Sequence, residues 1–206
     1  MPRRVDHEER RDQIVQAVWR LTERGGLGAA TFREVAAEAG VSVRLVQYYF
    51  GTKAALLAEA NRRALGLMAG RILDRLGAFG EDAAPRDVVA GVLREFLPTD
   101  ERSRRAMVLY YAFYTAQMSD PSLRGVGRVP EALVTLLADQ IRRAEATGTV
   151  AAGVHPELEA TLLIAVVAGL SSGVLAGYSS LDESAAALDY AVDRIFRPAS
   201  QHAPDQ

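Results

Sequence analysis

The chain has 206 residues, of which 49% are hydrophobic and 24% charged, proportions that allow a continuous core in a soluble protein. It contains no cysteine, which excludes disulfide bonds, thiolate metal sites and a cysteine nucleophile. Its three histidines, His7, His155 and His202, lie far apart in the sequence, so we expect no metal site and no other cofactor.

The net charge of −2 conceals a difference between the two ends of the chain. Residues 1–63 hold 11 basic and 8 acidic residues, whereas residues 64–206 hold 13 basic and 18 acidic residues. A basic N-terminal part on an acidic body is typical of a DNA-binding head on a body that does not bind DNA. Because a difference of this size is also common by chance, local motifs have to decide its meaning.

The first predicted helix covers residues 12–24 and ends at two glycines. Its apolar side chains recur with the 3.6-residue period of a helix and are Ile14, Val15, Val18 and Leu21. Thr31 is the predicted N-cap of a short helix to residue 39, with Glu34 in the capping-box position. Ser42 and Thr52 are predicted caps of a short helix to residue 49 and of a long helix over residues 53–78.

Five further helices are predicted after the loop at residues 77–85. They cover residues 86–97, 100–118, 130–146, 156–178 and 182–196, and they stop near residues 98, 119–121, 147–148 and 198. No alternating strand pattern of useful length is present in the sequence. We therefore expect an all-α fold of about nine helices, a three-helix head joined to a helical bundle. The predicted domains are residues 1–52 and 53–198, followed by a disordered polar tail at 199–206.

The segment 31–53, TFREVAAEAGVSVRLVQYYFGTK, has the features of a helix-turn-helix. Two short helices cross closely only where a small residue lies between them, which Ala36 supplies. The turn requires a left-handed residue, and Gly40 adopts that conformation without steric cost. Val46 is the predicted apolar anchor of the second helix. The same apolar side also includes Val35, Ala39 and Val41.

The opposite face of the second helix is predicted to enter the major groove of DNA. Arginine can donate two hydrogen bonds to guanine, and glutamine can pair with adenine. The predicted base-contacting residues are Val43, Arg44, Gln47 and Tyr48. The predicted phosphate-contacting residues are Thr31, Ser42, Tyr49 and Lys53, which lie at helix ends. A helical hairpin without DNA-binding activity is the alternative, but polar residues gathered on one outward face favour DNA binding.

Residues 14–57 resemble the DNA-binding domain of the TetR (tetracycline-repressor-like) family. The family pattern T-x-x-x-[IV]-A-x-x-A-G-V-S, followed by aromatic residues and K-x-x-L, is matched by Thr31, Val35-Ala36, Ala39-Gly40-Val41-Ser42, Tyr48-Tyr49-Phe50 and Lys53-Ala54-Ala55-Leu56. Gln47 departs from the aromatic residue or leucine of many members. The resemblance implies that Tyr48, Tyr49 and Lys53 hold phosphates and that Phe50 packs into the head. The middle of the chain is similar to the subgroup that includes the choline-responsive repressors.

The helix predicted over residues 100–118 groups three of the seven tyrosines within five residues. Tyrosine combines an apolar ring with a hydroxyl that needs a partner, so such a group suits a pocket of mixed polarity. An ordinary core stripe is the alternative, and the TetR resemblance implies ligand binding among these helices. The predicted pocket residues are Leu65, Met68, Ile72, Phe96, Met107, Tyr110, Tyr111, Tyr114 and Met118. We expect Phe113 on another face, and Arg94 and Glu95 in solvent.

The helix predicted over residues 156–178 carries glycines four residues apart, a row that lets another helix approach closely. Each costs up to about 1 kcal/mol in a helix interior, so the packing gained should offset that cost. Packing inside one subunit is the alternative, but the resemblance implies a dimer interface formed by the last two long helices. The predicted interface residues are Leu162, Val166, Gly169, Gly173, Gly177, Tyr190 and Ile195. A two-fold dimer predicts a palindromic or near-palindromic operator.

The most apolar stretch covers residues 162–175 and is shorter than the roughly 20 residues that span a bilayer. We therefore expect a buried helix there and no membrane partner. The first twelve residues are charged and no apolar segment follows them, so no signal peptide is expected. These features predict a cytoplasmic protein.

The sequence as a whole predicts a ligand-responsive repressor that binds double-stranded operator DNA as a homodimer. A small, largely apolar molecule would release it, with the helix over residues 53–78 transmitting the change. An activator, or a regulator controlled by a protein partner, would need the same DNA head and is the alternative. An enzyme is not expected, because Glu157 and Glu159 near His155 are explained by their place at a helix start. Non-specific DNA compaction would need a more basic surface.

Overall fold

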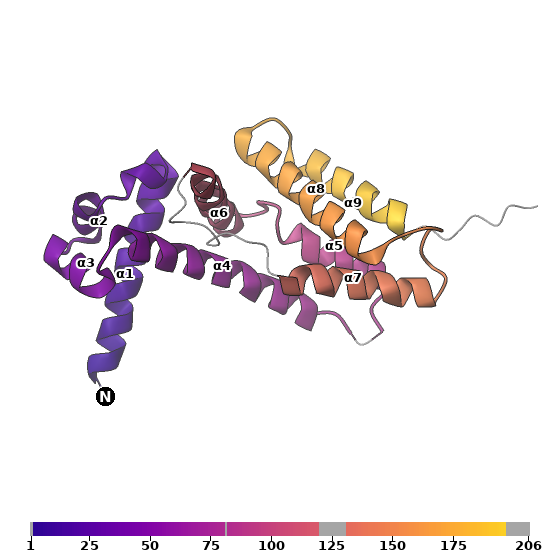
Figure 1. Cartoon of the computed structure of the whole chain (residues 1–206), viewed down its shortest axis with the longest axis horizontal. Helices are drawn as coiled ribbons and strands as arrows, with labels where there is room; N and C mark the ends of the chain where they lie inside the picture. The colour runs from indigo at the N-terminus through magenta and orange to yellow at the C-terminus, as the bar shows by residue number, and fades with distance from the viewer. Residues whose placement is uncertain (1, 81, 120–130, 197–206) are drawn as a thin grey trace, which may run out of the picture. The chain divides into compact units, whose positions relative to one another are not determined.

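The computed structural model describes residues 2–80, 82–119 and 131–196, and within these ranges the chain forms nine α-helices and no strand (Figure 1). The helices are α1 (Pro2–Gly25), α2 (Phe32–Ala39), α3 (Val43–Phe50), α4 (Lys53–Gly77), α5 (Pro85–Arg94), α6 (Glu101–Ser119), α7 (Glu131–Ala146), α8 (Pro156–Ala176) and α9 (Leu181–Ile195), with a 3-10 turn at Leu27–Ala29. The predicted all-α fold is confirmed. The predicted boundaries at residues 120–121, 130 and 198 and the predicted tail at 199–206 lie outside the described residues.

Three helix boundaries differ from the prediction by more than one residue. α1 begins at Pro2 rather than at residue 12, because the polar turns at its start contact the end of α3 instead of a core. α5 ends at Arg94 rather than at residue 97, because the next three amides each bond to the carbonyl three residues back. α8 ends at Ala176, because Gly177 has a left-handed backbone (φ 76°) and caps the helix.

The chain divides into two compact units. The head unit comprises Met1–Leu67 and Arg105–Arg128, and the body unit comprises Met68–Arg104 and Val129–Gln206. α4 and α6 therefore each contribute residues to both units.

The core of the head unit is formed by α1 to α4 together with one face of α6. Trp19 on α1 is buried, and its indole Nε1 donates to the Ala60 carbonyl of α4 at 3.0 Å. Leu109 and Phe113 of α6 are buried in the same cluster. The largest other members of this core are Ile14, Val15, Val18, Val35, Val46, Phe50, Leu56 and Leu57. α6 thus belongs in part to the head, a partnership that the local sequence pattern does not reveal.

The core of the body unit lies between α5, α7, α8 and α9 (Figure 1). α5 is buried along most of its length, and Gly91 allows the Phe79 ring to approach it. A Cβ atom at Gly91 would lie 2.7 Å from the Phe79 Cζ, so a larger residue would displace the ring. The Ser180 hydroxyl and the Glu183 carboxylate form a complete capping box at the start of α9.

The prediction that the apolar stretch at residues 162–175 forms a buried helix is wrong for the single chain. By length and composition alone α8 could cross a membrane, and within the chain only 22% of its apolar window is buried. α7 and α9 pack against one face of α8, and that face carries Ala160, Leu163, Val167 and Ser171. The opposite face exposes Leu158, Leu162 and Val166. Exposed apolar faces of this kind mark interaction sites in many proteins.

Candidate nucleic-acid interface

The turn between α2 and α3 has the geometry that the sequence predicts. Gly40 adopts the left-handed conformation (φ 64°, ψ 33°), and its amide caps the end of α2. The next amide, of Val41, donates to the Ala36 carbonyl at 2.9 Å. Ala36 and Val46 are both buried between the helices, as predicted. The two helices therefore form a helix-turn-helix whose first helix supports the second.

Each helix of the motif, and the one that follows it, begins with a hydroxyl cap. Thr31 Oγ1 accepts from the Glu34 amide at 3.2 Å, and Ser42 Oγ accepts from the Leu45 amide at 3.1 Å. Thr52 Oγ1 accepts from the Ala55 amide at 3.1 Å at the start of α4. Since each hydroxyl accepts in its cap, its own hydrogen remains free to donate to a phosphate oxygen.

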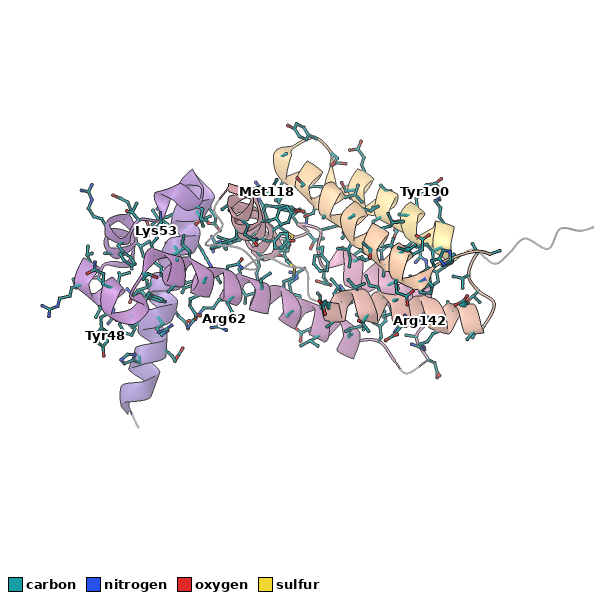
Figure 2. The ribbon with its side chains drawn as sticks, in the orientation of Figure 1. Tyr48, Lys53, Arg62, Met118, Arg142 and Tyr190 are labelled. Atoms are coloured by element: carbon teal, nitrogen blue, oxygen red, sulfur yellow. The ribbon has the colours of Figure 1, made fainter. Side chains whose placement is uncertain are left out.

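The four predicted base-contacting residues gather on one exposed face of α3. Tyr48, near the end of α3, is 72% exposed (Figure 2), and Val43, Arg44 and Gln47 are also exposed. Lys53 is exposed in the first turn of α4. Their contacts with DNA stay a prediction, but the required geometry is present.

The cationic side chains of the head unit fall into two groups, those paired with a carboxylate and those that are not. Arg20 and Arg24 of α1 both bind Glu38 of α2, and the hydrogen bond from Arg20, then that from Arg24, holds the pKa of Glu38 below its usual value. By contrast, no salt bridge or side-chain hydrogen bond between described residues involves Arg44 or Lys53. The motif therefore carries cations that are free to meet DNA.

An aromatic group closes the C-terminal end of α3. The Tyr48 and Tyr49 rings meet edge to face with centroids 5.5 Å apart, and Tyr49 is half-buried. The ring of His7, on α1, lies 4.7 Å from that of Tyr49. Sequence reasoning missed His7, because it precedes the apolar stripe by which the first helix was recognised.

The predicted pocket residues divide between the two units. In the head unit, Tyr110 lies 5.3 Å from Tyr111 and stacks at 5.9 Å on Tyr114, with an interplanar angle of 19°. Burial, and to a smaller extent Tyr114, raises the pKa of Tyr110. Phe113 lies on another face of α6, as predicted, and the structure places that face in the head core. Three neighbouring rings on one face of α6 are thus brought together.

The other predicted pocket residues have mixed surroundings. In the head unit Met107 is buried, Leu65 is half-buried and Met118 is 80% exposed (Figure 2). In the body unit Met68 is buried, while Ile72 and Phe96 pack against the body core. Their joint role in a pocket stays a prediction.

The expectation that Glu95 lies in solvent is wrong. Glu95 is only 7% exposed, and its two carboxylate oxygens accept from Arg71 Nε at 3.0 Å and Arg75 Nε at 2.8 Å. The cause is long-range, because both arginines come from the end of α4, about twenty residues earlier in the chain. Arg94 is exposed as expected and binds Asp189 of α9.

The predicted interface residues are only partly available for a second subunit. Leu162 and Tyr190 are 56% and 62% exposed, and Val166 and Gly169 are also exposed (Figure 2 shows Tyr190 on α9). Ile195, the last residue of α9, contradicts the prediction, because its side chain is buried in the body core.

Two of the three glycines in the predicted row have tasks within the chain. Gly177 lies beyond the end of α8 as its left-handed cap, so it does not continue the row on the helix. A Cβ atom at Gly173 would lie 3.0 Å from the Ser179 hydroxyl, so this glycine serves packing inside one subunit. Nothing lies within 4 Å of a Cβ atom at Gly169, which leaves it open to a partner.

Two parts of the chain match families of known proteins. Residues 14–60 match the family described as bacterial regulatory proteins, tetR family. Residues 85–197 match the family described as BetI-type transcriptional repressor, C-terminal. The first match contains the helix-turn-helix, and the second covers more than half of the chain.

Curated relatives agree with these matches. The HTH-type transcriptional regulator PksA of Bacillus subtilis is 31% identical over 179 residues, which are 83% of this chain and 81% of that protein. The HTH-type transcriptional regulator BetI of Vibrio parahaemolyticus is 32% identical over 131 residues, 64% of this chain and 65% of that protein.

Solved structures of similar fold include two close in size to this chain. A putative TetR-family transcriptional regulator from Rhodococcus sp. superimposes with a TM-score of 0.81 at 25% identity, covering 91% of this chain and 99% of that one. A putative transcriptional regulator from Saccharomonospora viridis, in complex with choline, gives a TM-score of 0.80 at 25% identity and covers 90% and 96%.

These relatives are transcriptional regulators, which confirms the prediction that the chain is not an enzyme. The resemblance found in the helix-turn-helix and in the middle of the chain is confirmed as well. The chain belongs to the TetR family of bacterial transcriptional regulators and has a BetI-type C-terminal region.

Proposed function

We propose that this regulator is a cytoplasmic, dimeric repressor that is released from a palindromic operator by a small quaternary ammonium compound. The observation that carries the proposal is the exposed face of α3, where Arg44 and Gln47 stand beside Tyr48 above a buried support. This face has the size and chemistry that the major groove accepts. The BetI-type match, described as a repressor, supports repression over activation.

The proposed dimer rests on the uncovered apolar face of α8. Leu162, Val166 and Gly169 lie on that face, and Tyr190 of α9 adds an exposed ring. A symmetric partner that presents the same helices would bury these residues in a four-helix contact. Two heads related by a two-fold axis would then bind half-sites in successive major grooves, about 10 base pairs apart or a multiple of that.

The proposed ligand class rests on the aromatic group of α6. The stacked rings of Tyr110 and Tyr114 offer negative faces, which attract a cation that carries methyl groups and few strongly held waters. The choline complex of the similar regulator from Saccharomonospora viridis supports the same class. A ligand that binds better to a conformation with wrongly spaced heads lowers operator affinity by that difference.

Selection from a random pool of duplexes, followed by ligand titration, tests the proposal. We expect the purified protein to enrich a sequence with two inverted half-sites. Choline should then release that DNA, whereas 3,3-dimethylbutanol, a neutral molecule of the same shape, should not do so at the same concentration, because it lacks the charge.

Each part of the proposal has its own negative outcome. If no sequence is enriched, the DNA-reading assignment is wrong. If a sequence is enriched but choline neither binds nor releases it, the ligand class is wrong. A reporter driven by the selected operator should rise when the regulator is deleted; a fall would identify an activator.

A further inference from the structure

The N-terminal half of α1 runs past the C-terminal end of α3. The last carbonyls of a helix lack partners within that helix and must be satisfied by other groups. In α3 the Gln47 carbonyl accepts from the Gly51 amide at 2.8 Å. The Tyr49 carbonyl accepts instead from a side chain of another helix, through Arg11 Nη1 at 3.1 Å. α1 therefore completes the end of α3.

Arg11 is held by two neighbouring residues of α3 at once. Its guanidinium carbon lies 4.8 Å from the centre of the Phe50 ring, a cation–π contact beside the hydrogen bond to Tyr49. Phe50 is buried in the head core, so it gives the guanidinium a fixed base. A cation at the C-terminal end of a helix also interacts favourably with the helix dipole.

His7 extends the same contact by one helical turn. Residues four apart lie on one face of a helix, so His7 and Arg11 approach α3 together. The His7 ring meets the Tyr49 ring edge-on at 4.7 Å and lies 6.2 Å from the Tyr48 ring. Together, the two side chains of α1 fix both the backbone and the ring of Tyr49.

The same helix also closes the first helix of the motif. Gln13 Nε2 donates to the carbonyl of Ala39, the last residue of α2, at 2.6 Å. One helix therefore completes the ends of both α2 and α3.

We propose that Arg11 and His7 are positioning residues for operator recognition, which hold Tyr49 and Tyr48 where these side chains meet the DNA. The inference rests on the proposed function, because it assumes that Tyr49 donates to a phosphate. In this proposal Arg11 acts through Tyr49 and its neighbours, because one of its donors bonds to the Tyr49 carbonyl and its guanidinium lies against the Phe50 ring.

A double-mutant cycle between Arg11 and Tyr49 tests the proposal. We expect Arg11→Gln and Tyr49→Phe each to weaken binding of the selected operator by about tenfold, the size of one lost charge-assisted or buried hydrogen bond. The double variant should bind the operator no more weakly than the weaker-binding single variant. Without the Tyr49 hydroxyl, the position of the Tyr49 side chain no longer affects binding. Fluorescence anisotropy at fixed salt concentration measures all four affinities.

The salt dependence separates positioning from direct phosphate contact. A cation that neutralises a phosphate contributes close to one unit to the slope of log affinity against log salt concentration. Arg11→Gln should change that slope no more than Arg62→Gln does. Arg62 of α4 is exposed, binds Glu59, and is a matched control for the loss of one charge (Figure 2).

Conservative variants keep the test independent of folding. Arg11→Lys retains a cationic donor beside Phe50 and should recover most of the affinity, and His7→Phe should bind better than His7→Ala because it keeps the ring contact. The inference is overturned if the losses of Arg11→Gln and Tyr49→Phe multiply, if the slope falls by about one, or if Arg11→Gln binds like the wild type. If the wild type enriches no operator at all, the proposed function has failed first.

Discussion

Arg44 and Lys53 are both exposed cations of the DNA-binding head, yet they should act differently. Arg44 stands on the outward face of α3, and its planar guanidinium can donate two parallel hydrogen bonds to a guanine edge. Lys53 opens α4, and its ammonium is a point charge that suits a phosphate. One residue should therefore determine which base is read, and the other should determine how tightly any DNA is held.

Arg44→Ala should cost about 1–3 kcal/mol of operator binding and relax the base preference at one position of each half-site. Lys53→Ala should weaken binding to all sequences alike and reduce the salt slope by about one, since one phosphate contact is lost. Anisotropy titrations on the selected operator and its single-base variants, at several salt concentrations, measure both effects. Unchanged discrimination in Arg44→Ala would show that α3 faces the DNA differently.

At the level of elements, the junction between α5 and α6 is held by charge. Asp100 Oδ1 accepts from the Ser103 amide at 2.6 Å at the start of α6, and Asp100 Oδ2 accepts from Arg71 Nη1 of α4 at 3.0 Å. The Ser103 amide, followed by Arg71, lowers the pKa of Asp100 to about 2. Arg71 also binds the buried Glu95, so one guanidinium links α4 to the end of α5 and the start of α6.

Asp100→Asn should reduce stability in a pH-dependent way. The folded pKa of Asp100 lies below its unfolded value, so the carboxylate stabilises the fold fully above about pH 4 and loses this effect as the pH falls toward about 2. Asparagine keeps the helix cap and removes the charge. Because the Asp100 side chain is 53% exposed, we expect the substitution to lower the free energy of unfolding by at most about 1 kcal/mol at pH 6.

Urea unfolding between pH 2.5 and 6 measures this difference. The difference in the free energy of unfolding between the wild type and Asp100→Asn should become smaller as the pH falls. Glu101→Gln, one residue along the chain, controls for the change in net charge. If that difference stays constant or increases toward low pH, the ionised Asp100 carboxylate does not stabilise the fold as proposed.

Most elements follow from local signals, but their partners do not. The caps at Thr31, Ser42 and Thr52 and the stripe of α1 predict helices because a cap and an apolar period act within a few residues. Local signals place Glu95 in solvent, whereas it is buried because its partners come from α4. The predicted domain limits at residues 1–52 and 53–198 stay a prediction, and parts of α4 and α6 pack in the head unit.

At the scale of the whole molecule, the exposed apolar face of α8 is the basis of the proposed dimer. This face, with Leu162 at the centre, exposes apolar surface that a symmetric partner would bury. The predicted interface changes in one respect, because Ile195 lies in the body core and cannot contribute.

Leu162→Glu should produce a folded monomer. The side chain is 56% exposed in the single chain, so its replacement leaves the core intact, whereas an unpaired carboxylate in the dimer contact should weaken association by at least about 100-fold. Sedimentation measures the oligomeric state, and operator binding should weaken with it. Leu73→Glu on α4 is the matched control, because Leu73 is also exposed and lies outside α8 and α9. If the Leu162→Glu variant remains dimeric, this face of α8 is not the dimer interface.

The helices, the helix-turn-helix residues and the family can be derived from the sequence, because caps, turn glycines and apolar periods are properties of neighbouring residues. The pairing of Glu95 with Arg71, the insertion of Phe113 into the head core and the contact of Arg11 with Tyr49 could not be derived in that way. Each depends on residues more than twenty positions apart, and only the packing of whole helices brings them together.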